Sequence, residues 1–363
     1  MEPRPELEKL IPCPHGGPDY GELERMGLPP EEILDFSVST NPFGPPPGMR
    51  EILLQIPIEK YPDTEATSLR RKLSESLGVD MNEIIIGNGS MEILRLFSLA
   101  FLREGVKTLI LEPTFGEYEV AAKIMGSRVI KLFSEEEKDF RHNLEEILSI
   151  IRRERIDVLF ICNPNNPTGQ YLKPEEMEKL LKALEGILVV DEAYISFVEK
   201  GRSSIELLRK GNILILRSLT KDYSLAGLRL GYGIAPRKLI EPINKVKPPW
   251  NVNSIALKAG EIALAGKDFL EESMKKIRES SLFLREGFKK LGLKVIPSHA
   301  HFFMVKVGNA KKFREKLLRK RIQVRDCSSF GLPSYIRVSP RTIPEGETLL
   351  KAVRETLSEN ENQ

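Results

Sequence analysis

The chain has 363 residues, 41% of them hydrophobic and 29% charged, a composition that suits a globular protein and excludes collagen and wholesale disorder. Its 55 lysines and arginines nearly balance 52 aspartates and glutamates, and a net charge of +3 does not favour nucleic-acid binding. No long uncharged apolar window predicts a membrane span, and the N-terminal residues lack the apolar core of a secretory signal. Three cysteines without metal-binding spacing indicate a reducing, cytoplasmic location.

The predicted elements begin with a segment that has no clear periodicity. Residues 1–45 are rich in proline and glycine, and we expect them to form an N-terminal arm laid across another surface. From residue 83 onward, the hydrophobic period alternates between that of strands and that of helices. Strands are expected at 83–86, 106–112, 127–132, 156–162, 187–193 and 212–218. Helices are expected at 91–102, 143–153 and 174–184, and one more follows the strand at 106–112 and ends near residue 124.

The continuous apolar strands predict a mostly parallel sheet, because such strands are buried by helices on both faces. We therefore expect an α/β fold in which residues 46–248 form a large domain with helices flanking this sheet. The regular alternation stops near Pro248, and a long charged helix at 268–291 is followed by less regular strands and helices. Residues 249–363 are therefore expected to form a smaller α+β domain.

Unusual residues fall at the ends of the predicted strands, the edge where open parallel sheets bind ligands. After the first strand, Gly89 permits a tight turn, and the N–H groups of Ser90 and Met91 at a helix start suit a phosphate. Asn166 lies in a loop whose two Asn-Pro steps restrict its shape, so its amide can be aimed at a ligand. An ordinary strand-to-helix loop and a rigid connector are the alternative interpretations of these segments.

Asp191 ends a strand too apolar to be exposed, so its carboxylate needs a cation or a hydrogen-bond donor. A strand-end aspartate that caps the following helix is the alternative. In the next strand-to-loop segment, Ser218 and Thr220 flank Lys221, and Arg229 follows. Two hydroxyls and a guanidinium suit a phosphate, and a lysine held beside them can form an imine.

A phosphate cage, an imine-forming lysine and an aspartate for a pyridinium nitrogen are together what pyridoxal 5′-phosphate requires. The motifs N-P-T-G, D-E-A-Y and S-x-T-K-x-x-x-L-A-G-L-R-x-G-Y, in this order, resemble those of the fold-type I, aspartate aminotransferase-like enzymes that use this cofactor. The resemblance covers nearly the whole chain.

The resemblance implies a role for each of these residues. Lys221 carries the cofactor, Asp191 pairs with its ring nitrogen, and Asn166 and Tyr194 bind its 3′-oxygen, so Lys221, Asp191 and Tyr194 are the expected catalytic residues. The expected phosphate cage consists of Gly89, Ser90, Met91, Ser218, Thr220 and Arg229.

Two aromatic residues also match positions of the family. Phe115 matches the ring that stacks on the cofactor, although a phenylalanine donates no hydrogen bond there. Tyr61 matches a tyrosine that reaches the phosphate of the neighbouring subunit. The resemblance therefore implies a homodimer with shared sites.

The arm narrows the resemblance further. Residues 14–28 and 33–46 resemble threonine-phosphate decarboxylases of cobalamin synthesis, which are akin to histidinol-phosphate aminotransferases. We therefore expect decarboxylation of L-threonine O-3-phosphate to (R)-1-amino-2-propanol phosphate. The alternative is transamination between histidinol phosphate and 2-oxoglutarate, because the lysine and the cofactor-binding residues do not separate the two reactions.

Either substrate is a small phosphorylated amino compound, and the resemblance implies which residues bind it. Arg337 matches an arginine that grips a carboxylate, and Arg325 matches a position used for the substrate's phosphate. Arg341 is a third candidate with less support, and solvated arginines or a turn-capping histidine are the alternatives. The expected substrate-binding residues are His15, Asn41, Asn166, Arg325 and Arg337.

Other kinds of site are not expected. The pairs Cys13 with His15 and His299 with His301 have no carboxylate or further cysteine at a matching spacing, so no metal site is predicted. A nicotinamide oxidoreductase would need a G-x-G-x-x-G after the first strand, which is missing. No residues are left over for a fused DNA-binding module.

Overall fold

A seven-stranded sheet organises the larger part of the molecule in the computed structural model, which describes residues 2–8 and 10–361. Its strands are β2 (Ile84–Asn88), β3 (Lys107–Glu112), β4 (Arg128–Phe133), β5 (Val158–Cys162), β6 (Ile187–Asp191), β7 (Ile213–Ser218) and β8 (Leu230–Ile234). They lie in the order β2-β8-β7-β6-β5-β3-β4. Only β8 pairs antiparallel with its neighbours, so the expected α/β fold with a mostly parallel sheet is confirmed.

Helices cover both faces of this sheet, because alternate residues of each strand are apolar and buried on opposite sides. Ile85, Phe160 and Leu214 face one cluster, to which three helices contribute: α5 (Ser90–Phe101), α6 (Glu117–Ile124) and α10 (Arg237–Val246). Their neighbours along the strands face the other cluster, with α4 (Thr67–Leu77), α7 (Leu144–Glu154), α8 (Pro174–Ala183) and α11 (Ser254–Ala265). Each large aliphatic side chain buried here contributes roughly 1.5–3 kcal/mol.

Several elements of this unit were missing from the sequence prediction, among them α4, β8, α10 and α11. Strand β8 contains Gly231 and Gly233, which weaken the pattern of a strand, and α10 contains Pro242. Helix α11 places Ala256 and Ala259 in the same apolar cluster as the sheet. The core of the large sheet therefore extends past the expected boundary at residue 248.

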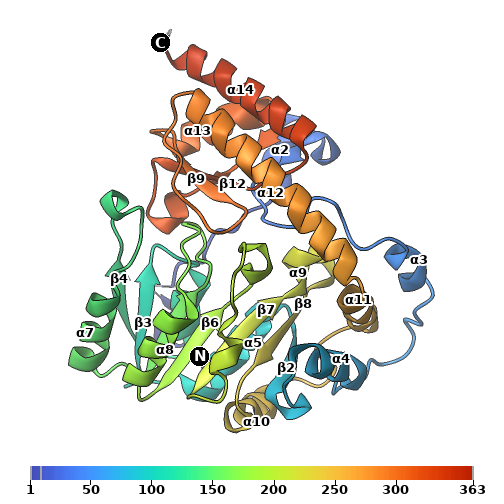
Figure 1. The fold of residues 1–363 in the computed structure, drawn as a ribbon, viewed down its shortest axis with the longest axis vertical. Helices are drawn as coiled ribbons and strands as arrows, with labels where there is room; N and C mark the ends of the chain where they lie inside the picture. The colour runs from blue at the N-terminus through green and yellow to red at the C-terminus, as the bar shows by residue number, and fades with distance from the viewer. Residues whose placement is uncertain (1, 9, 362–363) are drawn as a thin grey trace.

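A second, smaller unit packs beside the large sheet (Figure 1). Its antiparallel sheet, in the order β11-β12-β9, consists of β9 (Phe303–Lys306), β11 (Arg325–Asp326) and β12 (Tyr335–Val338). The helices around it are α12 (Lys267–Lys290), α13 (Ala310–Arg319) and α14 (Ile343–Glu361). Phe288 and Phe303 are fully buried in its core. None of the described helices is both long and apolar enough to cross a membrane.

The N-terminal arm contacts both units. It contains α1 (Pro5–Glu8), which contacts α6, then α2 (Tyr20–Met26) and β1 (Leu34–Asp35). Strand β1 pairs in parallel with β10 (Ile322–Gln323) of the smaller unit, and Phe36 is fully buried in that unit's core. The chain then passes through α3 (Met49–Leu53) into the large unit, as the blue segment of Figure 1 shows.

Candidate active site

A cavity of about 390 Å³ lies at the carboxyl edge of the large sheet. Parallel strands end together at this edge, so the residues that follow β2, β5, β6 and β7 meet there although they are distant in sequence. The smaller unit and the arm close the other side. The cavity is lined by these residues singled out in the sequence: His15, Gly89, Ser90, Met91, Phe115, Asn166, Asp191, Tyr194, Ser218, Thr220, Lys221, Arg229, Arg325 and Arg337.

One end of the cavity is built to bind an anion. Gly89 precedes α5 with φ 75°, so the first N–H groups of the helix, beginning with Ser90, border the cavity. A Cβ at Gly89 would lie 3.0 Å from Arg229 Nη2, so glycine lets the guanidinium approach the turn. The hydroxyls of Ser218 and Thr220 lie 2.6 Å apart beside them. This donor set suits a phosphate group.

Lys221 lies on α9 (Leu219–Asp222), directly after β7. Burial, reinforced by the cationic Arg337 and Arg229, lowers the pKa of its amine to about 8, and Asp191 opposes this shift. The Nζ atom lies 6.0 Å from the centroid of the Tyr194 ring. A lysine in this state can take up or release a proton near neutral pH.

Asp191 ends β6 and is 8% exposed. Its Oδ2 accepts a hydrogen bond of 2.9 Å from the Tyr118 hydroxyl, and its Oδ1 accepts one of 3.0 Å from the backbone N–H of Ala193. Burial raises the pKa of this carboxyl, and both donors oppose the rise. Tyr118 was not singled out in the sequence, although it follows Phe115 by one helical turn and the two rings pack edge to face at 5.6 Å.

Arg337 joins three parts of the molecule at the cavity. Its Nη1 donates to Asn166 Oδ1 in the loop after β5, and its Nη2 donates to the Ser37 carbonyl of the arm at 2.6 Å. The side chain is buried, and its Nε has no partner within the described residues. Burial also raises the pKa of the neighbouring Tyr194 to about 12, so that hydroxyl stays a donor.

Arg325 holds the arm at the rim of the cavity. Its guanidinium donates to the carbonyl oxygens of His15 and Pro14, both at 2.7 Å. Burial and the nearby Arg337 lower its pKa. His15 Nε2 lies 3.2 Å from Glu117 Oε1. Two separate guanidiniums, those of Arg325 and Arg337, therefore border one cavity.

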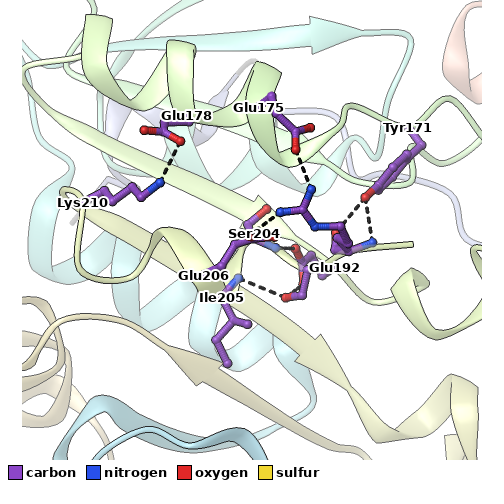
Figure 2. Close-up of polar contacts among 10 residues, drawn as sticks. Tyr171, Glu175, Glu178, Glu192, Ser204, Ile205, Glu206 and Lys210 are labelled. Carbon is purple, nitrogen blue, oxygen red and sulfur yellow. Dashed lines mark hydrogen bonds and ion pairs between the residues drawn. The ribbon is translucent and has the colours of Figure 1, made fainter. Parts of the chain in front are cut away.

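A buried network stands behind the cavity and joins the ends of β6 and β7. Glu192 follows Asp191, and its carboxylate accepts hydrogen bonds from the Ser204 N–H at 2.6 Å and the Ser203 hydroxyl at 2.7 Å (Figure 2). Arg217 of β7 forms an ion pair of 2.9 Å with the same carboxylate. Neither Glu192 nor Arg217 was expected from the sequence, because an exposed ion pair would show the same residue types.

Two predicted substrate-binding candidates lie elsewhere. Asn41 is buried, but its Nδ2 donates to the Asp222 carbonyl and its Oδ1 accepts from the Phe43 N–H, both at 3.0 Å. Its amide therefore holds the backbone beside Lys221 and is not part of the cavity lining. Arg341, two residues before α14, pairs at 2.7 Å with Glu345 in the first turn of that helix. We therefore no longer assign either side chain to the substrate.

Tyr61 also lies outside the cavity of its own chain. Its side chain is 80% exposed and stacks on Trp250, with the ring centroids 4.5 Å apart. Leu54 and Ile58 are similarly exposed nearby in sequence, at 88% and 81%. This position is compatible with the expected contact to a second subunit.

The chain was compared with known proteins. Residues 31–353 match the family described as aminotransferase class I and II. A histidinol-phosphate aminotransferase from Methanocaldococcus jannaschii is 34% identical, covering 98% of this chain and 97% of the relative. A histidinol-phosphate aminotransferase structure from Sinorhizobium meliloti, in complex with pyridoxal-5′-phosphate, superimposes with a TM-score of 0.87 at 26% identity, covering 98% of this chain and 97% of that one.

These comparisons correct the expectation of a decarboxylase. Further relatives, 31% to 36% identical, are also histidinol-phosphate aminotransferases. An L-threonine-O-3-phosphate decarboxylase from Porphyromonas gingivalis is a structural neighbour at 26% identity, with a TM-score of 0.79 and coverage of 90% of this chain and 100% of that one. The findings favour the aminotransferase, and decarboxylation was the wrong expectation.

The structure gives a physical reason for this error. In the arm, Ser37 Oγ accepts a hydrogen bond from the Gly17 N–H at 3.0 Å and donates one to Asp35 Oδ1 at 2.6 Å. The motif residues that suggested the decarboxylase therefore stabilise the conformation of the arm. Their hydrogen bonds do not determine which bond at the substrate carbon is broken. The chain belongs to the class I and II aminotransferases, and it is a fold-type I enzyme that uses pyridoxal 5′-phosphate.

Proposed function

We propose that the protein transfers the amino group of histidinol phosphate to 2-oxoglutarate. The observation that carries this proposal is the similarity to histidinol-phosphate aminotransferases over almost the entire length of both chains. The cavity supports it, because it combines an anion-binding end, a lysine with a lowered pKa and two arginines.

The donor set of the cavity fits the cofactor. Ser218, Thr220, Arg229 and the N-terminus of α5 would hold its phosphate, and the missing side chain at Gly89 leaves the room that this requires. Asp191 would pair with the protonated ring nitrogen. When bound, pyridoxal 5′-phosphate supplies a ring that accepts electrons from the substrate carbon bearing the amino group.

The protein's own residues would then orient the substrate and move its proton. Lys221 Nζ, with its pKa lowered to about 8, is the base that would take the proton from the substrate carbon that bears the amino group. Asn166 and Tyr194 present an amide and a protonated hydroxyl to the same space. Burial of these groups keeps water away and strengthens their electrostatic interactions.

The two arginines support a reaction with two different substrates. Histidinol phosphate carries a phosphate and no carboxylate, whereas glutamate and 2-oxoglutarate carry two carboxylates. Arg325 has the more exposed position at the rim, and Arg337 lies buried beside Asn166. We infer that Arg325 and Arg337 bind the two carboxylates of glutamate and 2-oxoglutarate, and that Arg325 binds the single phosphate of histidinol phosphate, since the planar fork of arginine fits carboxylate and phosphate alike.

We also propose a homodimer in which Tyr61 reaches the neighbouring site. Its exposed ring, stacked on Trp250, borders a surface hollow together with the exposed Ile58, and Leu54 is exposed as well. Burying such large apolar side chains against a second copy stabilises an assembly.

The deciding assay offers histidinol phosphate with 2-oxoglutarate, and separately O-phospho-L-threonine, to the cofactor-loaded enzyme. We expect glutamate to form in the first mixture and no CO₂ to be released in the second. The Lys221→Ala variant is the control for chemistry that does not need the site. Release of CO₂ from phosphothreonine, without glutamate from histidinol phosphate, would refute the proposal.

A further inference from the structure

A group of potential metal ligands lies at the rim of the cavity. Cys13 Sγ, His15 Nε2 and a Glu117 carboxylate oxygen all lie within 4.8 Å of one another. Cys13 and His15 belong to the arm, and Glu117 begins α6. The sequence near Cys13 and His15 contains no carboxylate at a matching spacing. Glu117, about a hundred positions away, supplies it in the folded chain.

The geometry suits a zinc ion. Zinc binds cysteine sulfur, histidine nitrogen and carboxylate oxygen at about 2.0–2.3 Å, so the ligand atoms of a tetrahedral site lie about 3.3–3.6 Å apart. His15 Nε2 and Glu117 Oε1 are already 3.2 Å apart. A thiolate and a carboxylate would supply two negative charges against the two positive charges of the ion.

The surrounding residues hold these ligands in place. Arg95 Nη2 donates to Glu117 Oε2 at 2.6 Å, which leaves Oε1 turned toward His15. Arg325 holds the carbonyl oxygens of Pro14 and His15 and so fixes the loop between the two arm ligands. Such hydrogen bonds to the ligands' other atoms are how proteins orient metal-binding side chains.

The contact between the arm and α6 is also unusually close. A Cβ on Gly116 would lie only 2.8 Å from Cys13 Sγ, so the missing side chain at this position allows the sulfur to approach the start of α6. The Cys13 thiol contacts the Pro14 carbonyl at 3.6 Å, and its sulfur accepts a backbone hydrogen bond from Gly116 while keeping further lone pairs. Its sulfur is therefore available as a ligand.

We propose that Cys13, His15 and Glu117 bind one Zn²⁺ ion, with water in the fourth position, and that this ion ties the arm to α6 across the cavity rim and inhibits turnover. Cys13 and His15 both line the cavity, so an ion between them restricts the passage of substrate. The inhibition rests on the proposed aminotransferase activity, whereas the binding of the ion does not.

Calorimetric titration of the tag-free, chelator-treated holoenzyme with ZnCl₂ tests the binding. We expect one ion per chain, and an affinity at least about tenfold lower in Cys13→Ser and in Glu117→Gln. The matched controls are Cys327→Ser, buried in the smaller unit, and Glu119→Gln, on the same helix as Glu117, and both should keep the wild-type affinity. Equal affinity in wild type and Cys13→Ser would overturn the site.

X-ray absorption and kinetics separate the two parts of the proposal. The zinc edge should reveal one sulfur ligand at about 2.3 Å in the wild type and none in Cys13→Ser. Zinc should slow glutamate formation, a chelator should restore it, and Cys13→Ser should resist the inhibition. A bound zinc without a sulfur ligand would refute the site, and unchanged turnover at saturating zinc would refute the inhibition.

Discussion

At the scale of single residues, protonation in the cavity is set by burial and by neighbouring charges. Lys221 loses the water that would stabilise its ammonium form, and two arginines repel the same charge. Asp191 is buried as well, yet it keeps two donors that favour its charged form. The two groups therefore shift toward each other on the pH scale, the lysine downward and the aspartate upward.

The lowered pKa of Lys221 is directly measurable. In the cofactor-free protein, competitive labelling with acetic anhydride and peptide mass spectrometry should give Lys221 an apparent pKa of about 8. Between this value and the ordinary 10.5, the unfolded chain holds the proton more tightly, so the stability of the fold should rise with pH in that window. A measured value near 10.5 would show that Lys221 is not held as described.

Tyr118 is expected to position the carboxylate of Asp191. A hydrogen bond from a hydroxyl to a charged group such as the Asp191 carboxylate contributes roughly 1.5–3 kcal/mol. Because the Asp191 carboxylate would lose this donor, Tyr118→Phe should lower kcat by about ten- to a hundredfold. Because the ring itself stays packed against Phe160, the melting temperature should change little. The cofactor's absorbance as a function of pH gives a second measurement, and an unaltered titration with unaltered kcat would exclude this role.

At the scale of elements, the ends of β6 and β7 are tied together by Glu192 and Arg217. Figure 2 shows Glu192 beside Ser204, and the side chains of Glu175, Glu206 and Lys210, also labelled there, are much more exposed than that of Glu192. Removing one partner of a buried pair leaves an uncompensated charge, which costs about 3–5 kcal/mol. The exposed pairs contribute far less, because water and salt screen them.

Chemical unfolding should distinguish these two kinds of ion pair. Arg217→Leu should lower the free energy of unfolding by about 3–5 kcal/mol, because Glu192 stays buried without its cation. Arg202→Leu removes two ion pairs with Glu175 and Glu206, yet it should have little effect because all three side chains are largely exposed. Equal destabilisation by the two variants would contradict the importance of burial.

The turn before α5 depends on a glycine in β8. A Cβ on Gly231 would lie 2.4 Å from the Ser90 N atom, so Gly231→Ala should displace the N-terminus of α5 and weaken cofactor binding by at least about tenfold, or 1.4 kcal/mol. Gly227→Ala is the matched control, because no atom lies within 4 Å of its Cβ position. Titration of the cofactor-free variants measures both affinities, and similar values for the two would speak against a tight turn.

Local sequence was sufficient for those parts of the site that lie within one segment. Ser218, Thr220 and Lys221 are adjacent to a strand end, so a continuous apolar run and the polar residues that follow it locate them together. Tyr118 and Glu117 were missed because each acts on a residue of another segment, Asp191 and His15. Their positions depend on the packing of α6, which no local pattern contains.

The same distinction holds for the elements of the fold. Strands β5 and β6 could be predicted from the sequence, because each is a continuous apolar run, which is typical of a strand covered on both faces. Strand β8 was missed because Gly231 and Gly233 interrupt its apolar pattern, and its antiparallel direction is set by its partners β2 and β7. The pairing of β1 with β10 joins segments too distant for any local signal.

At the scale of the whole molecule, histidines that are hard to protonate make the fold sensitive to acid. Burial lowers the pKa of the partly buried His142 to about 4 and also lowers that of the fully enclosed His301, and partial desolvation together with nearby cations lowers the pKa of the more exposed His299. The unfolded chain gains these protons near pH 6.5 whereas the folded chain resists them, so stability is lost as the pH falls from 6.5 toward 4.

Replacing one of these histidines should reduce that loss. His142→Gln carries no titrating group, so its free energy of unfolding should fall less steeply between pH 6.5 and 4 than that of the wild type. His15→Gln is the control, since that side chain is more than half exposed. Urea unfolding at several pH values gives both slopes, and parallel slopes for His142→Gln and wild type would exclude a contribution from His142.

The contacts of the arm determine when the site can exist during synthesis. Arg325 and His15, which meet at the rim, are 310 residues apart, and Arg337 and Ser37 are 300 apart. A ribosome adds residues one at a time from the N-terminus, so the arm is made first. Its partners Arg325 and Arg337 are among the last residues to be made. The large sheet can fold before then, but the cavity stays open on one side. The site therefore cannot be completed before the C-terminal strands have been made, and a chain that ends before Arg325 lacks both guanidiniums that contact the arm at the cavity.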